Sequence, residues 1–309
     1  MNNFDMVARA MQCYRDSAVD ERISPNDSMN GPAYFDVGRH AVDAITAALL
    51  ASRTQEVHRV LDVPCGHGRV LRHLVKLFPD AAIDACDLDE DGVAFCASTF
   101  GARAIPSRKE LSEVDFGSTY NLIWVGSLFT HTAEDVTRRW LAHLARFLAE
   151  DGIVVATLHG RFCERRGEVK PYISPDAWRS ILDGYRRTGY GYRDYPSGVA
   201  PGFIAGSYGI SLVRPDVMIQ MIEQIPGVRI FSYIERGWGD YHDVLAFGRP
   251  AHDEPWPGME EVKSPAIRPA RPGFRMAQRW VRRARRRVRA RSRWKAGRAT
   301  VTRRFARRN

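Results

Sequence analysis

Short apolar runs alternate with amphipathic segments between residues 57 and 158. Each run has the length of a buried strand, and the apolar side chains of each intervening segment recur at helical spacing. The runs predict strands at 58–63, 82–87, 103–105, 120–125 and 153–158. Strands that alternate with helices are typical of a doubly wound α/β fold, in which helices cover both faces of a mainly parallel sheet.

The amphipathic segments predict helices with recognisable ends. Thr132-x-x-Asp135 has the pattern of a capping box, which predicts a helix that continues through Leu148 and ends at Asp151-Gly152. Pro215 suits the first position of a later helix. The predicted helices cover 39–52, 70–78, 93–100, 135–148, 175–187 and 215–224.

The second half of the chain predicts a hairpin and an insertion. Strands at 228–234 and 243–247 flank the glycine-containing segment 236–240, so we expect an antiparallel hairpin that completes a seven-stranded sheet. Residues 160–210 are rich in Tyr, Gly and Pro, and we assign them to an insertion on the substrate side. We therefore divide the chain into an N-terminal lid and helix, a main domain, and a Pro-rich linker with an Arg-rich tail, at 1–55, 56–250 and 251–309.

The formal net charge of +10 combines two regions of opposite sign. Residues 263–309 hold 19 Lys and Arg and no Asp or Glu, so residues 1–262 carry 27 basic against 36 acidic side chains, a net −9. Trp280, Ala284 and Val288 recur at intervals of four among the arginines, which suits a basic helix lying on anionic lipid. The same charge would also bind RNA phosphates, or leave the tail as a solvated extension.

The cysteines and the apolar stretches bear on the compartment. The five cysteines are odd in number and never form C-x-x-C, which favours neither a disulfide framework nor a zinc cluster. Residues 1–20 lack the apolar core of a signal peptide, and no apolar stretch approaches the ~20 residues that span a bilayer. We expect a cytoplasmic protein, with peripheral attachment at the inner face of the membrane as an option for the tail.

The motif that carries chemistry lies between the first predicted strand and its helix, in Val60–Leu71. Glycines at this point let a ligand approach the backbone closely, and the helix that follows offers free N–H groups to an anion. Asp87 ends the next strand, where an acid can accept hydrogen bonds from both ribose hydroxyls of a nucleotide cofactor. A dinucleotide site requires G-x-G-x-x-G, but its third glycine falls on Leu71, which disfavours a nicotinamide cofactor.

These residues resemble the class I S-adenosylmethionine-dependent methyltransferases, whose first motif is an acid, one residue and G-x-G-x-G. The resemblance extends to the strand and loop at 120–131 and to 148–157, and it implies the Rossmann-like fold and the cofactor S-adenosylmethionine. The resemblance places Asp62 near the methionine amine of the cofactor, and Gly66 and Gly68 beneath its methionine and ribose. It places Asp87 on the ribose and Leu88 on the adenine. Pro64 stands in place of the first glycine of the motif, and Ser127 is a further expected cofactor contact.

Three histidines are candidates for a general base. Methyl transfer to a hydroxyl requires alignment of the oxygen with the methyl group, exclusion of water and removal of a proton, and it requires no metal. His131 follows the fourth strand, His159 ends the fifth, and His242 lies in the final hairpin. His131 has the alternative role of closing the cofactor pocket, His159 that of an ordinary loop residue, and Asp240 and Tyr241 remain further options.

The substrate is predicted only by class. The Asn-Pro-Pro-Tyr-type signature of enzymes that methylate amino groups of DNA bases is absent after 120–125. The segments 208–212 and 236–244 resemble methyltransferases of polysaccharide and glycan biosynthesis, and the aromatic residues of 172–208 suit a stacked sugar or instead a core. We expect O-methylation of a sugar-containing or small hydroxylated molecule beneath a lid at 28–38. An RNA methyltransferase anchored by its tail is the alternative enzyme, and a non-catalytic protein of the same fold is the third reading.

Overall fold

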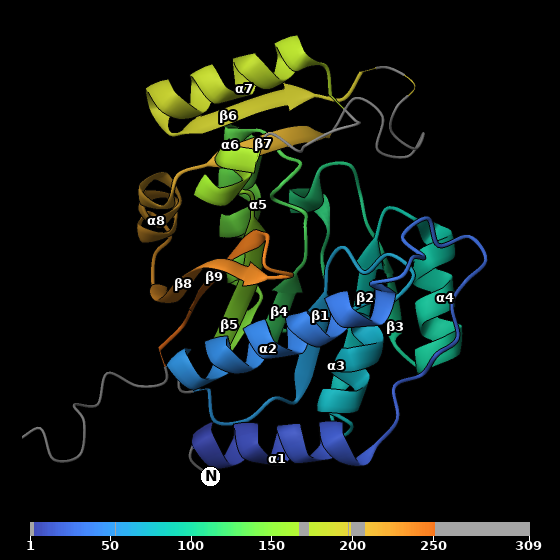
Figure 1. Ribbon diagram of the computed structural model, residues 1–309. Helices are drawn as coiled ribbons and strands as arrows, with labels where there is room; N and C mark the ends of the chain where they lie inside the picture. Colours follow the sequence, from blue (N-terminus) through green and yellow to red (C-terminus); the bar gives the residue numbers. More distant parts are fainter. Residues whose placement is uncertain (1–2, 53, 167–172, 197, 199–207, 251–309) are drawn as a thin grey trace, which may run out of the picture. The chain divides into compact units, whose positions relative to one another are not determined.

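The computed structural model describes residues 3–52, 54–166, 173–196, 198 and 208–250 (Figure 1). The predicted linker and tail lie outside these residues, so the division of the chain stays a prediction. The described helices are α1 (Asn3–Asp16), α2 (Tyr34–Ser52), α3 (Leu71–Leu77), α4 (Glu90–Phe100), α5 (Glu134–Arg146), α6 (Arg161–Arg166), α7 (Pro175–Thr188) and α8 (Pro215–Glu223), with a 3-10 turn at Leu111–Glu113. The described strands are β1 (Arg59–Asp62), β2 (Ala82–Asp87), β3 (Arg103–Pro106), β4 (Tyr120–Val125), β5 (Leu148–Leu158), β6 (Tyr190–Asp194), β7 (Gly209–Val213), β8 (Arg229–Trp238) and β9 (His242–Gly248).

The main sheet has seven strands in the order β3-β2-β1-β4-β5-β9-β8. The first five strands are parallel, whereas β9 runs antiparallel to both β5 and β8. The predicted Rossmann-like sheet with its C-terminal hairpin is therefore confirmed. Because β1 and β4 are neighbours and their helices cover opposite faces, the loops that follow them open a crevice at the carboxyl ends of the strands.

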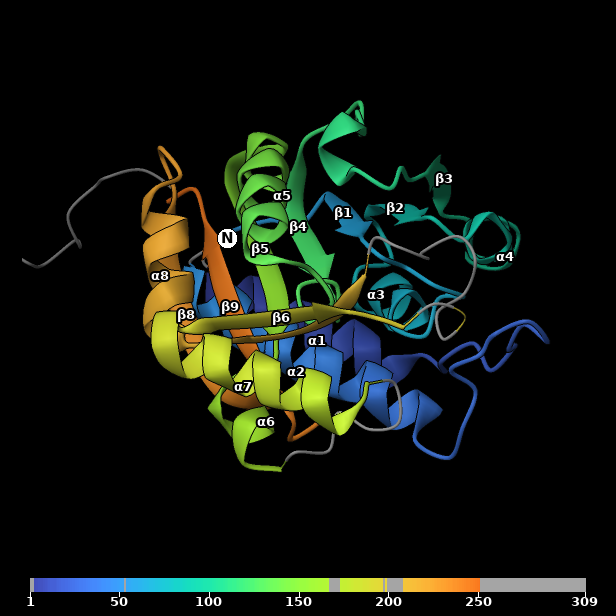
Figure 2. The ribbon, with the colours of Figure 1, turned by 90° about the horizontal axis from the view of Figure 1, so that it is seen from above.

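Alternating side chains along the strands build two cores. Val60 and Trp124 point to the face covered by α2, α3 and α4, whereas Leu61 and Ile123 point to the face covered by α5 and α8. Helix α1 packs on α2 and α3. Figure 2, seen from above, shows α5 on one side of the strands and α2 and α3 on the other. Both faces of the strands are buried, which is why the sequence shows nearly continuous apolar runs.

Four predicted boundaries were wrong, and one helix was missed. Thr132 does not cap α5: Ala133 precedes the helix without a side-chain cap, and the Thr132 hydroxyl instead pairs with that of Thr137 at 2.7 Å. The helix ends at Arg146, and β5 begins at Leu148 because a bulge lets that residue pair with Tyr120. The long helix α2 begins at Tyr34 rather than at residue 39, and α1 was not predicted.

The insertion after β5 contains a second, two-stranded sheet that was not predicted. Strands β6 and β7 pair antiparallel and pack with α6 and α7 around a small core of their own. The insertion lies over the carboxyl ends of β4 and β5 (Figures 1 and 2). Backbone hydrogen bonds fix it there, because the amides of Gly209, Ser211 and Val213 donate to the carbonyls that follow β4 and β5, at 2.9, 3.0 and 3.0 Å.

Candidate active site

The loops after the parallel strands surround a cavity of about 260 Å³ at the carboxyl edge of the sheet. Its lining comes from the segment before α2, from the loops after β1, β2, β3 and β4, and from the insertion. The lining residues are Asp27, Ser28, Met29, Val63, Pro64, Gly66, His67, Asp87, Leu88, Asp89, Ser107, Arg108, Leu111, Ser127, Leu128, His131, Trp140, Tyr195 and Tyr208. Five of the seven predicted cofactor residues and one of the three predicted bases therefore border one cavity.

The glycine turn leaves space where side chains would otherwise stand. Gly66 and Gly68 have φ values of +51° and +77°, which glycine adopts without strain. A Cβ on Gly66 would meet nothing within 4 Å, so this backbone faces open space in the cavity. A Cβ on Gly68 would lie 2.6 Å from the ring of Phe100, so this glycine serves close packing against α4. Pro64 also borders the cavity, and its peptide bond with Val63 is cis.

Asp87 connects the turn to the end of β2. Its two carboxylate oxygens accept hydrogen bonds from the amides of Gly66 and Asp89, at 2.7 and 2.9 Å. Burial raises the pKa of Asp87, and these backbone donors act in the opposite direction. A carboxylate has about four acceptor positions, so Asp87 can still accept hydrogen bonds from the hydroxyl groups of a ligand. Leu88, Trp140 and Leu111 give the neighbouring part of the cavity an apolar surface.

Asp62 is a buried carboxyl group without a partner. Its exposed fraction is 1%, and neither of its oxygens has a hydrogen-bond partner among the described residues. Burial first, and the nearby Asp87 second, raise its pKa well above the ordinary value. Because an unpaired buried charge is costly, this position suits a ligand that brings positive charge to the turn. The sulfonium and ammonium groups of S-adenosylmethionine have that charge, so the donor set fits the expected cofactor.

Ser127 borders the cavity in a strained conformation. Its φ of +59° lies in the left-handed region of backbone conformation, which few residues other than glycine occupy. The Ser127 amide donates to the Thr157 hydroxyl at 2.7 Å, and its own hydroxyl pairs with that of Thr130 at 3.0 Å. Strain that is held by such bonds often marks a functional loop.

The structure brings the three predicted bases into one aromatic cluster. The ring centroids of His131 and His159 are 6.3 Å apart, and His159 stacks on His242 at 5.0 Å. Burial lowers the pKa of all three, to about 3 for His242, with repulsion between the rings as a further cause for His159 and His242. Of the three, His131 is the one that borders the cavity. The imidazoles are therefore neutral near pH 7 and can accept a proton.

Several lining residues were not predicted as site residues. Asp27 enters from the segment before α2, where it accepts a hydrogen bond of 2.7 Å from the Tyr34 hydroxyl. The predicted lid at 28–38 contributes Ser28 and Met29 to the lining, whereas Tyr34 is already helical. Tyr195 and Tyr208 come from the aromatic insertion, whose composition was the available signal.

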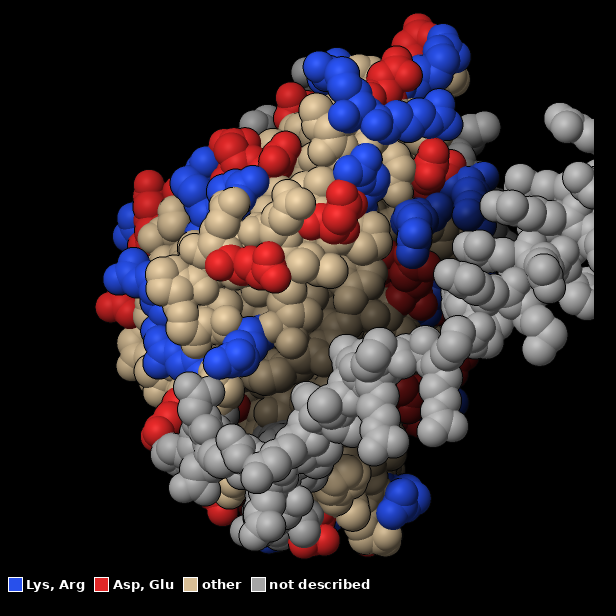
Figure 3. All heavy atoms as spheres, turned by 90° about the vertical axis from the view of Figure 1, so that its left-hand side faces the viewer, with Lys and Arg blue, Asp and Glu red and all other residues tan. Residues whose placement is uncertain are grey.

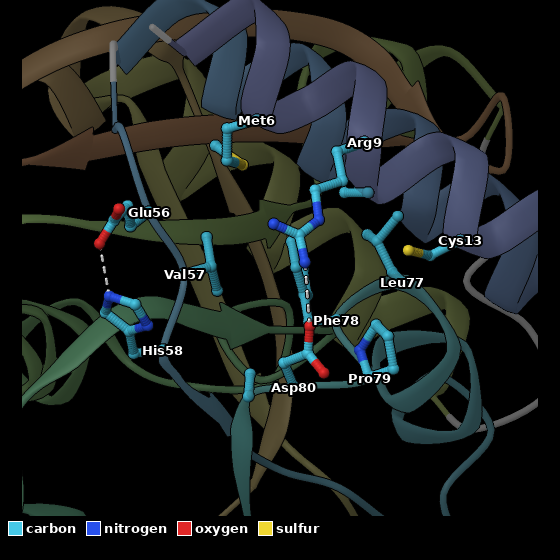
Figure 4. A pocket seen from close by; sticks show the side chains of 12 residues that line it. Met6, Arg9, Cys13, Glu56, Val57, His58, Leu77, Phe78, Pro79 and Asp80 are labelled. Atoms are coloured by element: carbon cyan, nitrogen blue, oxygen red, sulfur yellow. Dashed lines mark hydrogen bonds and ion pairs between the residues drawn. The ribbon is translucent and has the colours of Figure 1, made fainter. Parts of the chain in front are cut away.

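A second cavity lies at the opposite end of β1, beneath α1, with a volume of about 160 Å³ (Figure 4). Its polar side chains pair with one another: Arg9 with Asp80 at 3.4 Å, and His58 with Glu56 at 2.6 Å. Both pairs lie at the exposed rim, and the rest of the lining is mainly apolar. This cavity holds none of the predicted site residues. In addition, no helix of the described chain is long and apolar enough to cross a membrane.

Comparisons with known proteins give one family match and several similar solved structures. Residues 61–154 match the family model described as "Methyltransferase domain". No curated protein sequence matched the chain. Similar solved structures include an S-adenosylmethionine-dependent methyltransferase from Clostridium acetobutylicum ATCC 824, with 10% identity, coverage of 72% of this chain and 94% of that one, and a TM-score of 0.47.

Two further structures come from proteins with narrower descriptions. The DesVI protein of Streptomyces venezuelae has 22% identity, coverage of 70% and 95%, and a TM-score of 0.43. An amino pentose methyltransferase from Micromonospora echinaspora, solved with S-adenosylmethionine bound, has 18% identity, coverage of 70% and 92%, and a TM-score of 0.44. At these identities and TM-scores the likenesses say nothing about the substrate of this chain.

Proposed function

We propose that this chain uses S-adenosylmethionine to O-methylate a sugar-containing or other small hydroxylated substrate. Residues 61–154 match the family model of a methyltransferase domain, which supports the proposal. The observation that carries the proposal is the pair of buried acids, Asp62 and Asp87, on either side of a glycine turn that faces open space. This arrangement suits a cationic nucleoside cofactor.

We assign the cofactor to the cavity at the carboxyl edge. Asp87 would accept the ribose hydroxyls, and Asp62, which is buried behind the lining, would offset the positive charge of the methionine end. Gly66 and Pro64 would form the floor beneath the cofactor, Gly68 shapes the turn from behind, and Leu88 and Trp140 would offer the adenine an apolar surface. The remaining assigned contact is Ser127.

The protein then has to orient a hydroxyl group and take its proton. When bound, S-adenosylmethionine supplies an electrophilic methyl group on a sulfonium. His131 accepts the proton of the substrate hydroxyl, since it is neutral and reaches the same cavity as the cofactor residues. Tyr195 and Tyr208 border the same cavity, where they would exclude water and present their rings to the substrate. His159 packs against His131, and His242 against His159, outside the lining of the cavity.

Neutral recognition favours a hydroxylated substrate over a charged one. The neutral imidazole of His131 can accept a hydrogen bond from the hydroxyl group of a sugar. Aromatic rings such as Tyr195 and Tyr208 suit the apolar face of a sugar ring. We place the activity in glycan or polysaccharide biosynthesis, in the cytoplasm, with the tail at 263–309 as an attachment to anionic lipid.

RNA is the alternative substrate, and the side of the molecule that carries α7 and α8 favours it less. Figure 3 looks onto the side that carries α7 and α8, where basic and acidic side chains are interspersed rather than separated by sign. Ion pairs such as Arg214–Asp216, at 2.6 Å, already neutralise arginines there. A phosphate-binding surface requires unpaired Lys and Arg over an extended face.

The decisive experiment combines binding with transfer. Calorimetry with S-adenosylmethionine should show heat of binding, and none would contradict the enzyme reading in favour of a non-catalytic protein. Labelled cofactor is then incubated with separate glycan, small-molecule and RNA fractions of the cell. Label in a hydroxyl of the first two fractions supports the proposal, whereas label in RNA that vanishes on deletion of 263–309 would replace it. Flotation with vesicles of anionic lipid tests the tail separately.

A further inference from the structure

One edge of strand β7 holds two of the histidines by both their backbones and their side chains. The amide of Gly209 donates to the carbonyl of His131, and the carbonyl of Gly209 lies 2.9 Å from Nδ1 of the same residue. Two residues further along this edge, the carbonyl of Ser211 lies 3.1 Å from Nδ1 of His159. Alternate residues of a strand share an edge, so this geometry follows directly from the β7 backbone.

The carbonyl contacts determine which nitrogen bears the proton. A carbonyl oxygen only accepts hydrogen bonds, so a hydrogen bond between Nδ1 of His131 and Gly209 assigns the ring hydrogen to Nδ1. In the neutral ring Nε2 is then the unprotonated nitrogen. Nε2 is consequently the atom of His131 that can take a proton from a substrate.

Tyr195 supplies a second partner at the same nitrogen. Its hydroxyl oxygen is 2.9 Å from Nδ1 of His131, and the two ring centroids are 5.8 Å apart. The amide of Tyr195 donates to the carbonyl of Tyr208 at 3.0 Å, which ties this residue to the start of β7. Because Nδ1 already bears its hydrogen, the Tyr195 oxygen shares it as an acceptor. Tyr195 and His131 both border the cavity.

We propose that Tyr195 is a positioning residue for His131, which together with the Gly209 carbonyl keeps Nδ1 protonated and directs Nε2 toward the substrate hydroxyl. This inference rests on the proposed function. As the bond between the substrate oxygen and the methyl carbon forms and the carbon–sulfur bond breaks, the hydroxyl proton moves to Nε2. The resulting imidazolium keeps its Nδ1 hydrogen on the two acceptors, and its Nε2 proton later leaves to solvent.

The acceptors favour the charged ring more than the neutral one. An N–H of an imidazolium is the stronger donor, so loss of one acceptor weakens the cation most. The titratable groups that face His131 are Tyr195, His159 and His242. Neither of the two other histidines supplies a negative charge that would replace the lost acceptor.

The test compares Tyr195→Phe with Tyr192→Phe in the full chain. Tyr192 lies in the neighbouring strand β6, and its hydroxyl donates to Asp194 at 2.8 Å. Nitrogen NMR of isotope-labelled histidine, assigned with His131→Asn, reads the tautomer and the pKa without any substrate. We expect the Nδ1–H tautomer in the wild type, a further fall of about one unit in the pKa of His131 in Tyr195→Phe, and no shift in Tyr192→Phe.

Methyltransferase activity provides the second measurement. With the acceptor fraction that takes label, Tyr195→Phe should lower kcat about tenfold at unchanged KM, and should move the acidic limb of the pH profile to lower pH. An Nε2–H tautomer, or an unchanged pKa of His131 in Tyr195→Phe, would overturn the positioning role even if methyl transfer occurs. Absence of transfer to any hydroxyl in the wild type would instead refute the proposed function, while the NMR result still decides the role of Tyr195.

Discussion

The turn that follows β1 and the histidine cluster beside β7 both contain buried ionisable groups, but these groups have different proposed roles. Burial raises the pKa of Asp62 and Asp87, and it lowers the pKa of His131, His159 and His242. In both regions burial therefore disfavours the charged form. Asp62 lacks a partner and needs a nearby cation to be ionised at low cost, whereas the neutral imidazole of His131 can accept a proton as it stands.

This difference assigns a ligand to each region. A cationic cofactor supplies what the acidic turn lacks, since it offsets the cost of an ionised Asp62. A neutral hydroxyl group suits the imidazole cluster, because a neutral base is available to it near pH 7. Charge on the ligand, rather than the shape of the cavity alone, thus distinguishes the cofactor end from the substrate end.

The largest expected effect is on catalysis at the imidazole cluster. His131→Asn should lower kcat by roughly 10²–10³-fold, since the amide nitrogen of Asn can keep the bond to Gly209 but nothing replaces Nε2. In the wild type, kcat/KM should rise with pH only below pH 6.5, because the pKa of His131 lies under its ordinary value and the neutral ring is the active form. Steady-state transfer of labelled methyl measures both.

The exposed His40 in α2 provides the matched control for this substitution. His40→Asn should leave kcat unchanged, and both variants should bind S-adenosylmethionine as the wild type does. A loss of cofactor binding in His131→Asn would instead assign that histidine to the acidic turn and remove the contrast between the two regions.

The next effect is on binding at the acidic turn. Asp87→Ala should weaken the affinity for S-adenosylmethionine about 100-fold, through loss of charge-assisted bonds to two hydroxyls and of the anchor for the Gly66 amide. Asp115→Ala, at an exposed acid that likewise accepts a backbone amide, is the control. Calorimetry gives both dissociation constants. Affinity within threefold of the wild type in Asp87→Ala would refute the assignment of the ribose.

The features of the fold and the site that depend on neighbouring residues in the sequence were predictable, and those that depend on distant residues were not. The strand at 120–125 and the glycine turn follow from a continuous apolar run and from backbone freedom, both of which are local in sequence. Strand β6 was missed because it is short, contains Gly191 and pairs with a segment about twenty residues away. The clustering of the histidines and the position of Asp27 in the lining of the cavity depend on tertiary packing, which hydrophobic periodicity does not encode.

A smaller effect separates stability from binding. Asp62→Asn should raise the free energy of unfolding by roughly 2 kcal/mol at pH 7, because it removes a carboxyl group whose charge is costly to bury. The folded-state pKa of Asp62 is raised, so its contribution to stability is complete below the unfolded pKa and is lost as pH rises toward the folded value. The advantage of the variant should therefore grow with pH.

The same substitution should weaken binding of S-adenosylmethionine about tenfold, since the partner of the cation is lost. Denaturant unfolding at pH 4 and pH 7, together with calorimetry, gives both quantities. Asp84→Asn is the contrasting variant, because Asp84 is equally buried but hydrogen-bonded by Arg103 at 2.6 Å, and it should lose stability. Equal destabilisation of both variants would show that Asp62 is paired in solution.

The smallest expected effect tests whether the turn itself contacts the cofactor. Gly66 and Gly101 both have positive φ, +51° and +72°, and an added Cβ would meet nothing within 4 Å at either. Alanine at each position should therefore cost about 1 kcal/mol of unfolding free energy, from backbone strain alone. The two positions differ in that Gly66 borders the cavity, whereas Gly101 ends α4. Only Gly66→Ala should then weaken S-adenosylmethionine binding, about fivefold, and equal affinities in the two variants would move the cofactor away from the turn.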